Sequence, residues 1–522
     1  MQQMALLSVE QLVLPSVVLL IPLYLYIKSR RSNNNPLLPT NWPILGVLPS
    51  IAANRHSFHD FVTSVLTTTK LNFRVRGPPW TNMRFFLTCD PENVRHIFTT
   101  NFANYPKGGD FAAVFGILEG TIFTADGEPW RRQRARIHHV FTRPSFLAFM
   151  SCTCRDKVAH GLLPLLSRMA AAGAPFDMDD MLGRLVLDMT ATLVFGEDPL
   201  CLSADKPAVP VAAAMDAVME VAFFRHTVPT ACWKAMRRLG IGPERNVAAA
   251  EAVLWDFVSE KIRRRIAAGV PAAVHVDILS HYIDDDPDFF EDGGAAREPT
   301  DFLLRTFINF MVALRDPVGA ALPWLVYSLA THPRVVSTVR EELAPIVAND
   351  GRAMAAVVFE PEKLRGLVYL RAAVLESLRL YPPGPIERKA VVADDVLPSG
   401  HAVCAVETVL VPVYSMGRME SVWGEDCREY RPERWISTSE DGACRLRFVP
   451  SYKFLSFNTG PRSCLGKGIA MAQMMTVAAA VAWNFDVEVV EGHAVEHKLS
   501  VVLQMKNGLM VKVKRREGYG VI

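Results

Sequence analysis

The sequence predicts a mainly helical α+β fold, in which one large domain with a small β subdomain follows an N-terminal membrane anchor. Three observations favour this fold class. Helical periodicity dominates from about Pro144 to Leu380, and short alternating runs typical of strands occur at 73–89 and after Pro385. No repeat and no Gly/Ser-rich linker divides the chain after residue 50. The length of 522 residues suggests about three domains, but without a linker we expect a single one over 50–522.

The composition excludes several classes of protein. Half of the residues are apolar, 21% are charged, and the net charge is +2 at pH 7. Such a chain has enough apolar surface to offset the entropy of ordering its backbone, so it is neither disordered nor of low complexity. A charge this close to neutral argues against a nucleic-acid binder with a broad basic surface. Nine cysteines, irregularly placed, favour a reducing compartment over a disulfide framework.

The N-terminal segment has the length and apolar character of a membrane span. Residues 4–27 are mostly apolar, and about 20 residues are needed to cross the hydrocarbon core. A basic, proline-rich connector follows at 28–49, and the positive-inside rule then places the body in the cytosol. We therefore expect a single-pass protein of the endoplasmic reticulum membrane. A cleaved signal peptide is the alternative, but its basic leading region and small-residue cleavage site are missing.

The C-terminal end of the chain carries a hairpin signal. Alternating apolar residues run from Val501 to Val513 on either side of Asn507 and Gly508. Both central positions of a type I′ turn need positive φ, which asparagine and glycine adopt most readily. The pattern predicts a β-hairpin over 501–513.

The most informative stretch is a glycine-framed cysteine at 457–466, Phe-Asn-Thr-Gly-Pro-Arg-Ser-Cys-Leu-Gly, which precedes a helical pattern. Free backbone N–H groups and the helix dipole favour the thiolate of Cys464. Gly460 and Gly466 let the backbone approach a flat partner, and Arg462 supplies a guanidinium for an anionic group on it. These features suit an axial thiolate ligand to haem iron, which favours O–O cleavage. A buried structural cysteine is the alternative, but chance agreement at five fixed positions is rare.

The chain resembles the cytochrome P450 haem-thiolate family, whose cysteine loop has the pattern F-x-x-G-x-R-x-C-x-G, here beginning at Phe457. The resemblance implies that Cys464 is the fifth ligand to the iron of haem b. Glu376 and Arg379 match the family's E-x-x-R pair, and Arg434 lies in the Pro-Glu-Arg-Trp element whose arginine completes that ion network. Without the resemblance, Glu376 and Arg379 would be interpreted as a surface ion pair.

The resemblance also implies which residues hold the haem propionates. Trp130 and Arg134 lie in a stretch similar to the family helix whose tryptophan and arginine contact these carboxylates. Arg462 and Arg388, the latter in the strand after Pro385, would complete their neutralisation in a poorly solvated site.

Further basic residues at 131, 132 and 136 add positive charge around this tryptophan. They form either an ordinary solvated helix face or a docking surface for an acidic electron donor.

The pattern of the family is broken in its central helix. Where the family has A-G-x-D/E-T-T/S above the haem, this chain reads Ala313-Leu-Arg-Asp-Pro-Val. Ala313 and Asp316 match, but Leu314 replaces the glycine that makes room for dioxygen, and Pro317 replaces the threonine that helps deliver protons. Proline lacks the N–H that bonds the carbonyl one turn back, and it bends a helix. We expect proton delivery through Asp316 and bound water, a water held by the Ala313 carbonyl, and crowding by Leu314.

The leading prediction is a membrane-bound monooxygenase that inserts one oxygen atom into an unactivated C–H bond. The stretches at 309–316, 394–400 and 414–418 look most like the plant branch that hydroxylates long-chain fatty acids and alkanes. The resemblance implies an apolar, chain-shaped substrate and electrons from an NADPH-dependent flavoprotein reductase. Two alternatives remain open because of the altered central helix. One is a haem-thiolate isomerase or dehydratase that acts on oxygenated lipids, and the other is a catalytically impaired haem-binding protein.

Overall fold

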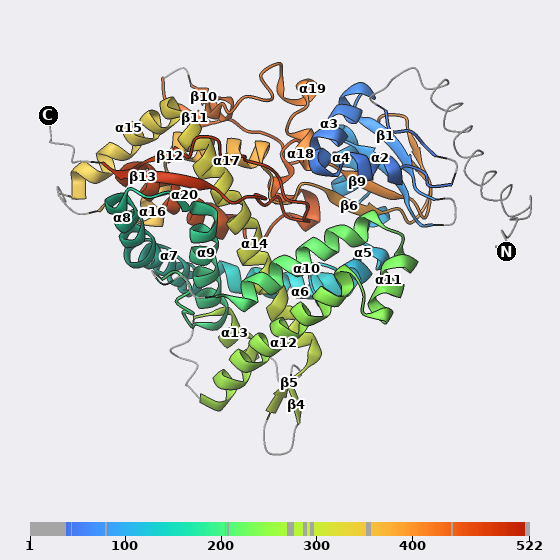
Figure 1. The fold of residues 1–522 in the computed structure, drawn as a ribbon, viewed down its shortest axis with the longest axis horizontal. Coiled ribbons are helices and arrows are strands. Elements are labelled where there is room, and N and C mark those ends of the chain that lie inside the picture. Colours follow the sequence, from blue (N-terminus) through green and yellow to red (C-terminus); the bar gives the residue numbers. More distant parts are fainter. Residues whose placement is uncertain are drawn as a thin grey trace, which may run out of the picture.

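Helices make up most of the structure and surround a long central helix, α14 (Asp301–Thr331), as Figure 1 shows. The predicted anchor at 4–27 lies outside the part of the chain that the computed structural model describes. Among the described helices, none combines the length and apolar character needed to cross a bilayer. The described residues are 38–42, 44–78, 81–203, 205, 208–268, 276–285, 290–292, 297–350, 356–439 and 442–516.

The elements confirm the expected mainly helical fold with a small β subdomain. The helices are α2 (Leu48–Ala53), α3 (Phe58–Thr68), α4 (Pro91–Arg95), α5 (Gly109–Val114), α6 (Gly127–Thr142), α7 (Pro144–Lys157), α8 (Leu163–Ala172), α9 (Met178–Phe195), α10 (Pro210–Thr227), α11 (Thr230–Leu239), α12 (Pro243–Ala268), α13 (Ile278–Asp285), α14, α15 (Pro333–Asp350), α16 (Pro361–Leu364), α17 (Val368–Leu380), α18 (Val413–Met416), α19 (Glu420–Trp423) and α20 (Lys467–Asn484). The strands are β1 (Asn72–Arg76), β2 (Arg84–Thr88), β3 (Phe176–Asp177), β4 (Phe290–Asp292), β5 (Arg297–Pro299), β6 (Glu387–Ala390), β7 (Asp395–Val396), β8 (Ala402–Val403), β9 (Thr408–Val411), β10 (Ile436–Thr438), β11 (Cys444–Leu446), β12 (Phe485–Val489) and β13 (Met510–Arg515).

The central helix α14 is stabilised by burial on nearly all sides. Its N-cap is Thr300, whose hydroxyl accepts from the N–H of Leu303 at 3.3 Å, and Asp301 lies in the first turn, where an acid favours the helix dipole. The first half packs in an apolar cluster with α9, α10 and α12, and the second half packs in another with α17 and α20. A helix that is apolar all round belongs inside a domain. It runs without a break through Pro317 and Pro323.

The β subdomain is centred on a four-stranded sheet in the order β1-β2-β9-β6. The β2–β9 pair is parallel, and the other two pairs are antiparallel. A third apolar cluster packs this sheet against α3 and α4. The predicted strands at 73–89 and after Pro385 are thus confirmed, and they lie together although about 300 residues separate them in the chain.

The predicted hairpin over 501–513 is wrong. The last strand, β13, pairs instead with β12 and with β3, which lies far earlier in the chain. Gly508 has φ +66°, but Asn507 does not adopt positive φ, so no type I′ turn forms. A Cβ on Gly508 would lie 2.2 Å from the carboxylate of Asp177, which accepts the N–H of Leu509 at 2.9 Å. The glycine therefore serves a tertiary contact, which local alternation does not reveal.

The end of the predicted connector belongs to the folded body. Val47 is buried, and its N–H donates to the carbonyl of Arg76 at 3.0 Å. Helix α2 begins at Leu48. The boundary predicted at residue 49 therefore lies too late in the chain, because local polarity does not show that this segment packs beside β1.

A largely buried ion network joins α17 to residues 417–435. The Arg379 guanidinium binds both oxygens of Glu376 at 2.7 Å, and neither side chain is exposed. Arg434 donates to the same carboxylate at 3.3 Å, and the indole of Trp435 donates at 2.9 Å. Arg379 also donates to backbone carbonyls, including that of Glu429 at 2.9 Å. The structure therefore brings together the three charged residues that the family pattern singles out, in the interior of the protein.

Glu376→Gln should destabilise the fold by about 3 kcal/mol or more, because it leaves the buried guanidinium group of Arg379 without a counter-charge. Urea unfolding followed by circular dichroism measures this loss. The matched control is Glu92→Gln, which removes an exposed ion pair with Arg95 and should change the free energy of unfolding by about 0.5 kcal/mol or less. Equal effects of the two substitutions would show that the buried network contributes little.

Candidate active site

The cysteine loop is held in place by backbone hydrogen bonds and one close contact. The N–H of Cys464 donates to the carbonyl of Phe457 at 2.8 Å, which closes the loop immediately before α20. Gly460 has φ +66°, and a Cβ there would lie 2.1 Å from the carbonyl oxygen of Phe98. At Gly466 a Cβ would meet only the Cys464 sulfur, at 3.9 Å. The first glycine is therefore required by the fold itself, whereas the second leaves open space beside the thiol.

The Cys464 thiol opens into the interior cavity although protein surrounds it. Burial raises its pKa, while the N–H of Gly466, Arg134 and Lys467 lower it. The helix start and its N–H groups thus favour the thiolate, as the sequence predicts, but burial outweighs them in the protein alone. A thiol in this state gives up its proton when a metal ion binds.

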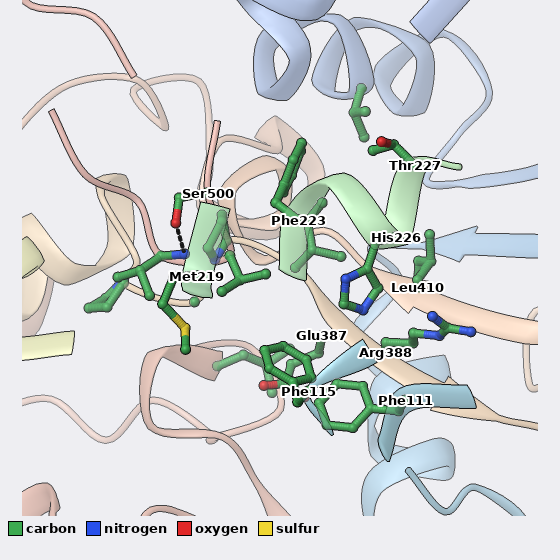
Figure 2. A pocket seen from close by; sticks show the side chains of 18 of the residues that line it. Phe111, Phe115, Met219, Phe223, His226, Thr227, Glu387, Arg388, Leu410 and Ser500 are labelled. Atoms are coloured by element: carbon green, nitrogen blue, oxygen red, sulfur yellow. Dashed lines mark hydrogen bonds between the residues drawn. The ribbon is translucent and has the colours of Figure 1, made fainter. Parts of the chain in front are cut away.

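A cavity of about 480 Å³ extends from Cys464 through the middle of the protein. Its walls are mostly apolar, and Figure 2 shows the part that α10 and α5 enclose. Ala313, Asp316 and Pro317 of α14 lie along one wall. The apolar wall residues include Ile51, Phe58, Phe61, Val65, Phe73, Val75, Phe85, Phe111, Phe115, Leu118, Met219 and Phe223.

Leu314 does not crowd this cavity, contrary to the prediction. Its side chain is buried in the apolar cluster shared by α9, α10 and α12, and Ala313 and Pro317 are the neighbours that line the cavity. The expectation was wrong because the direction of each α14 side chain depends on how the helix is rotated against its neighbours. The departure from the family pattern that faces the cavity is Pro317.

Asp316 is buried with one oxygen paired and the other without a partner. Its Oδ1 accepts from Arg315 at 2.9 Å, and Arg315 also donates to Asp216 of α10 at 2.6 Å. Its Oδ2 has no hydrogen-bond partner among the described residues. Burial raises the pKa of Asp316 to about 6, although Arg315 opposes the shift. A carboxyl group with such a pKa, beside a cavity, can accept and release a proton near neutral pH.

A basic cluster of α6 and the cysteine loop lies next to the thiol. The guanidinium of Arg462 stacks on the buried ring of Trp130 at 4.6 Å and donates to Asp126 at 2.6 Å. Arg134 donates to the carbonyl of Ser463 at 2.8 Å. The Nε of Arg462 is buried and has no partner in the described part of the chain. The structure thus brings Trp130, Arg134 and Arg462 together beside Cys464.

Sequence reasoning missed Lys389, which belongs to the same basic cluster. Its ammonium is fully buried, lies 4.7 Å from the ring of Phe98 and has no hydrogen-bond partner within the described ranges. Burial and the nearby charge of Lys107 lower its pKa to about 7, and Arg462 contributes in the same direction. Residues alternate across a strand, so Lys389 and Arg388 of β6 face opposite sides. The predicted site residue, Arg388, instead lines the cavity with Asp110 as its nearest carboxylate, 3.9 Å away.

The predicted electron-donor face on α6 is smaller than expected. Arg131 and Arg132 are exposed, but Arg136 is half-buried with its guanidinium 4.3 Å from the ring of Tyr282. The third arginine thus packs against the body of the protein. Two exposed guanidinium groups remain on this face.

Comparison with known proteins identifies the family. Residues 36–513 match the cytochrome P450 family. The chain is a cytochrome P450. It is 36% identical over 504 residues to noroxomaritidine synthase of Narcissus aff. pseudonarcissus MK-2014, covering 94% of this chain and 93% of that protein. It is 35% identical over 493 residues to alkane hydroxylase MAH1 of Arabidopsis thaliana, covering 94% and 95%. Cytochrome P450 86B1 of the same plant is 36% identical over 514 residues, covering 95% and 89%.

Members of this family use haem b with an axial thiolate and take electrons from a reductase partner, and the residues of this P450 fit that group. A sulfur atom opens into an apolar cavity, and the adjoining cluster holds the cations of Lys107, Lys389 and Arg462 against the carboxylates of Glu387 and Asp126. This excess of positive charge, with two buried N–H donors that lack partners among the described residues, matches a group that carries two carboxylates.

Gly460→Ala should destabilise this P450 by at least about 2 kcal/mol, because the substitution combines an unfavourable φ with a backbone clash. Gly466→Ala is the control, since its added methyl group meets open space and its φ is negative. Urea unfolding followed by circular dichroism compares the two variants. A loss of stability as large for Gly466→Ala as for Gly460→Ala would contradict this account of the loop.

Proposed function

We propose that this cytochrome P450 hydroxylates an apolar, chain-like molecule such as a long-chain fatty acid or alkane. The observation that carries the proposal is the cavity, which leads from Cys464 past α14 to the apolar residues of α2 and α3. Its walls offer an extended apolar lining, which is typical of small-molecule sites. The name of one relative, alkane hydroxylase MAH1, supports the same substrate class.

Several residues would hold the cofactor in this proposal. Haem b, when bound, supplies the activation of dioxygen. Cys464 would ligate its iron, and Arg462, Trp130 and Arg134 would hold its propionates, with Lys389 close behind them. Phe457, the first residue of the loop, packs against the apolar cluster that includes α20, and Gly460 and Gly466 keep the backbone close to the site. Ala313, which lines the cavity beside Pro317, has a carbonyl that receives no hydrogen bond from the proline and is free to hold a water molecule.

Asp316 takes over proton delivery in this proposal, because Pro317 has no hydroxyl. Its free Oδ2 accepts a proton from water that reaches the cavity, and its protonated form donates to water beside the substrate. Arg315 holds the other oxygen and is itself held by Asp216, so the carboxyl group keeps one orientation. The buried ion pairs thus fix the relay in place while one oxygen remains available.

The proposal includes a location and an electron donor. An anchor at 4–27 in the endoplasmic reticulum membrane would hold the body against the bilayer, from which an apolar substrate enters. An NADPH-dependent flavoprotein reductase would dock on the face of α6 that carries the exposed Arg131 and Arg132.

Replacing Cys464 with serine should abolish the thiolate signature in the carbon monoxide difference spectrum of the reduced protein. The wild type, supplied with reductase and NADPH, should consume oxygen in the presence of hexadecane or palmitate and form a hydroxylated product. Serine is a poor ligand for this iron, so the variant should form none.

Other results would replace the proposal. Conversion of a lipid hydroperoxide without reductant would identify an isomerase or dehydratase. Intact haem with neither activity would identify a binding protein.

Product formed per NADPH consumed should fall as the pH rises from 6 to 8. The reason is that Asp316 donates from its protonated form, whose share decreases about tenfold per pH unit above a pKa of about 6. Asp316→Asn should give a low ratio that does not vary with pH. Asp256→Asn, on the exposed side of α12, is the control and should keep the wild-type profile. A wild-type ratio independent of pH over this range would exclude Asp316 as the proton donor.

A further inference from the structure

One imidazole projects into the apolar cavity with a fixed tautomer. His226 lies in the last turn of α10, and Figure 2 shows its ring directed toward Arg388 and Phe111. Its Nδ1 lies 2.7 Å from the carbonyl oxygen of Ala222, which can only accept, so Nδ1 carries the proton. The proton on Nδ1 leaves Nε2 with a lone pair, and this atom has no hydrogen-bond partner among the described residues. His226 therefore presents a hydrogen-bond acceptor to the cavity.

A hydrogen-bond donor faces the same part of the cavity from the opposite wall. Arg388 of β6 is buried and lines the cavity, and it makes no hydrogen bond within the described part of the chain. Its nearest carboxylate, Asp110, is 3.9 Å away, beyond hydrogen-bond distance. The guanidinium is thus left with unused donors next to the imidazole.

Two aromatic rings lie close to this pair. The rings of Phe111 and Phe115 lie 6.2 and 5.7 Å from the imidazole of His226. Burial and the charge of Arg388 lower the pKa of His226 to about 3, so the ring is neutral at pH 7. Both groups face a mostly apolar cavity, so a ligand that forms hydrogen bonds with both gains affinity over one that forms none.

We propose that His226 and Arg388 form a site for a hydroxyl group of the substrate, whose O–H donates to Nε2 of His226 while its oxygen accepts from Arg388. The proposal rests on the function proposed above and narrows its substrate class to apolar chains that carry a hydroxyl group. A carboxylate fits less well, since it has no proton for the imidazole and lies near the negative charge of Asp110. An alkane leaves both groups without partners. The hydroxyl group can belong to a long-chain alcohol or to a phenol.

Ligand binding to the oxidised holoenzyme tests the site through the change in haem absorbance. Dodecane, 1-dodecanol and dodecanoate share one chain, and heptylbenzene and 4-heptylphenol share another. We expect His226→Phe to lower the preference for alcohol over alkane, or for phenol over arene, by about tenfold. Arg388→Met should have a similar effect, and His226→Gln, whose amide oxygen accepts a hydrogen bond, should retain most of the preference. The pair of ligands that shows the larger preference identifies the source of the hydroxyl.

Met219→Leu is the matched control in the same cavity and should change the affinity for all ligands of a series alike. An unchanged preference in His226→Phe, with haem content equal to the wild type, would overturn the proposal. So would a wild type that binds dodecanoate most tightly and loses this affinity in Arg388→Met.

The two proposals can fail separately. Oxidation of chains without any preference for a hydroxyl group would refute the site but leave the hydroxylase. A preference that depends on His226, without turnover of any chain, would support the site and refute the hydroxylase.

Discussion

The ion network around the buried carboxylate of Glu376 is the interaction on which the cysteine-loop side of this P450 depends. Charges are costly in an apolar interior unless each is paired and hydrogen-bonded, and here Arg379, Arg434 and the indole of Trp435 all bind one carboxylate. The network anchors the chain between α18 and β10 to α17. The same helix also accepts a hydrogen bond from Ser456 at the carbonyl of Leu378, 2.8 Å away, and Ser456 directly precedes the cysteine loop. The position of the sulfur atom is therefore tied to a set of ion pairs that make no contact with the cavity.

A second constraint acts on the other side of the loop. Gly460 lies so close to the Phe98 carbonyl that no side chain fits, and Arg462 stacks on Trp130 of α6. The loop is thus clamped between the ion network on one side and α6 with its neighbouring turn on the other. Both contacts limit where the loop can lie, so together they define the position of the thiol.

Local patterns predicted those features of the site that depend on local geometry. The cysteine loop needs particular residues at fixed spacing because its turn, its close contact and its charge are all set within ten positions. The mainly helical fold and the early and late strands likewise follow from periodicity. Three predictions failed where distant segments decide the outcome. Leu314 turns away from the cavity because of the packing of α14, Gly508 serves a contact with Asp177, and Val47 is buried beside β1. Lys389 was missed because its neighbour, Arg388, has the residue type that the family pattern favours. The sequence does not show which of these two side chains of β6 faces the basic cluster.

The cavity combines an apolar lining with acid–base groups at separate places. In the proposed function, these groups deliver protons without the threonine hydroxyl that Pro317 replaces. A relay needs a group that changes protonation near neutral pH, and burial gives Asp316 that property without help from a neighbouring alcohol. Full pairing would have lowered its pKa again, but Arg315 divides its donors between Asp316 and Asp216. One carboxyl oxygen therefore stays without a hydrogen-bond partner among the described residues. The proline beside it has no backbone N–H to donate to the carbonyl of Ala313, and in the proposed function this carbonyl accepts a hydrogen bond from water. The proposed relay thus uses a buried acid and this carbonyl in place of a side-chain hydroxyl.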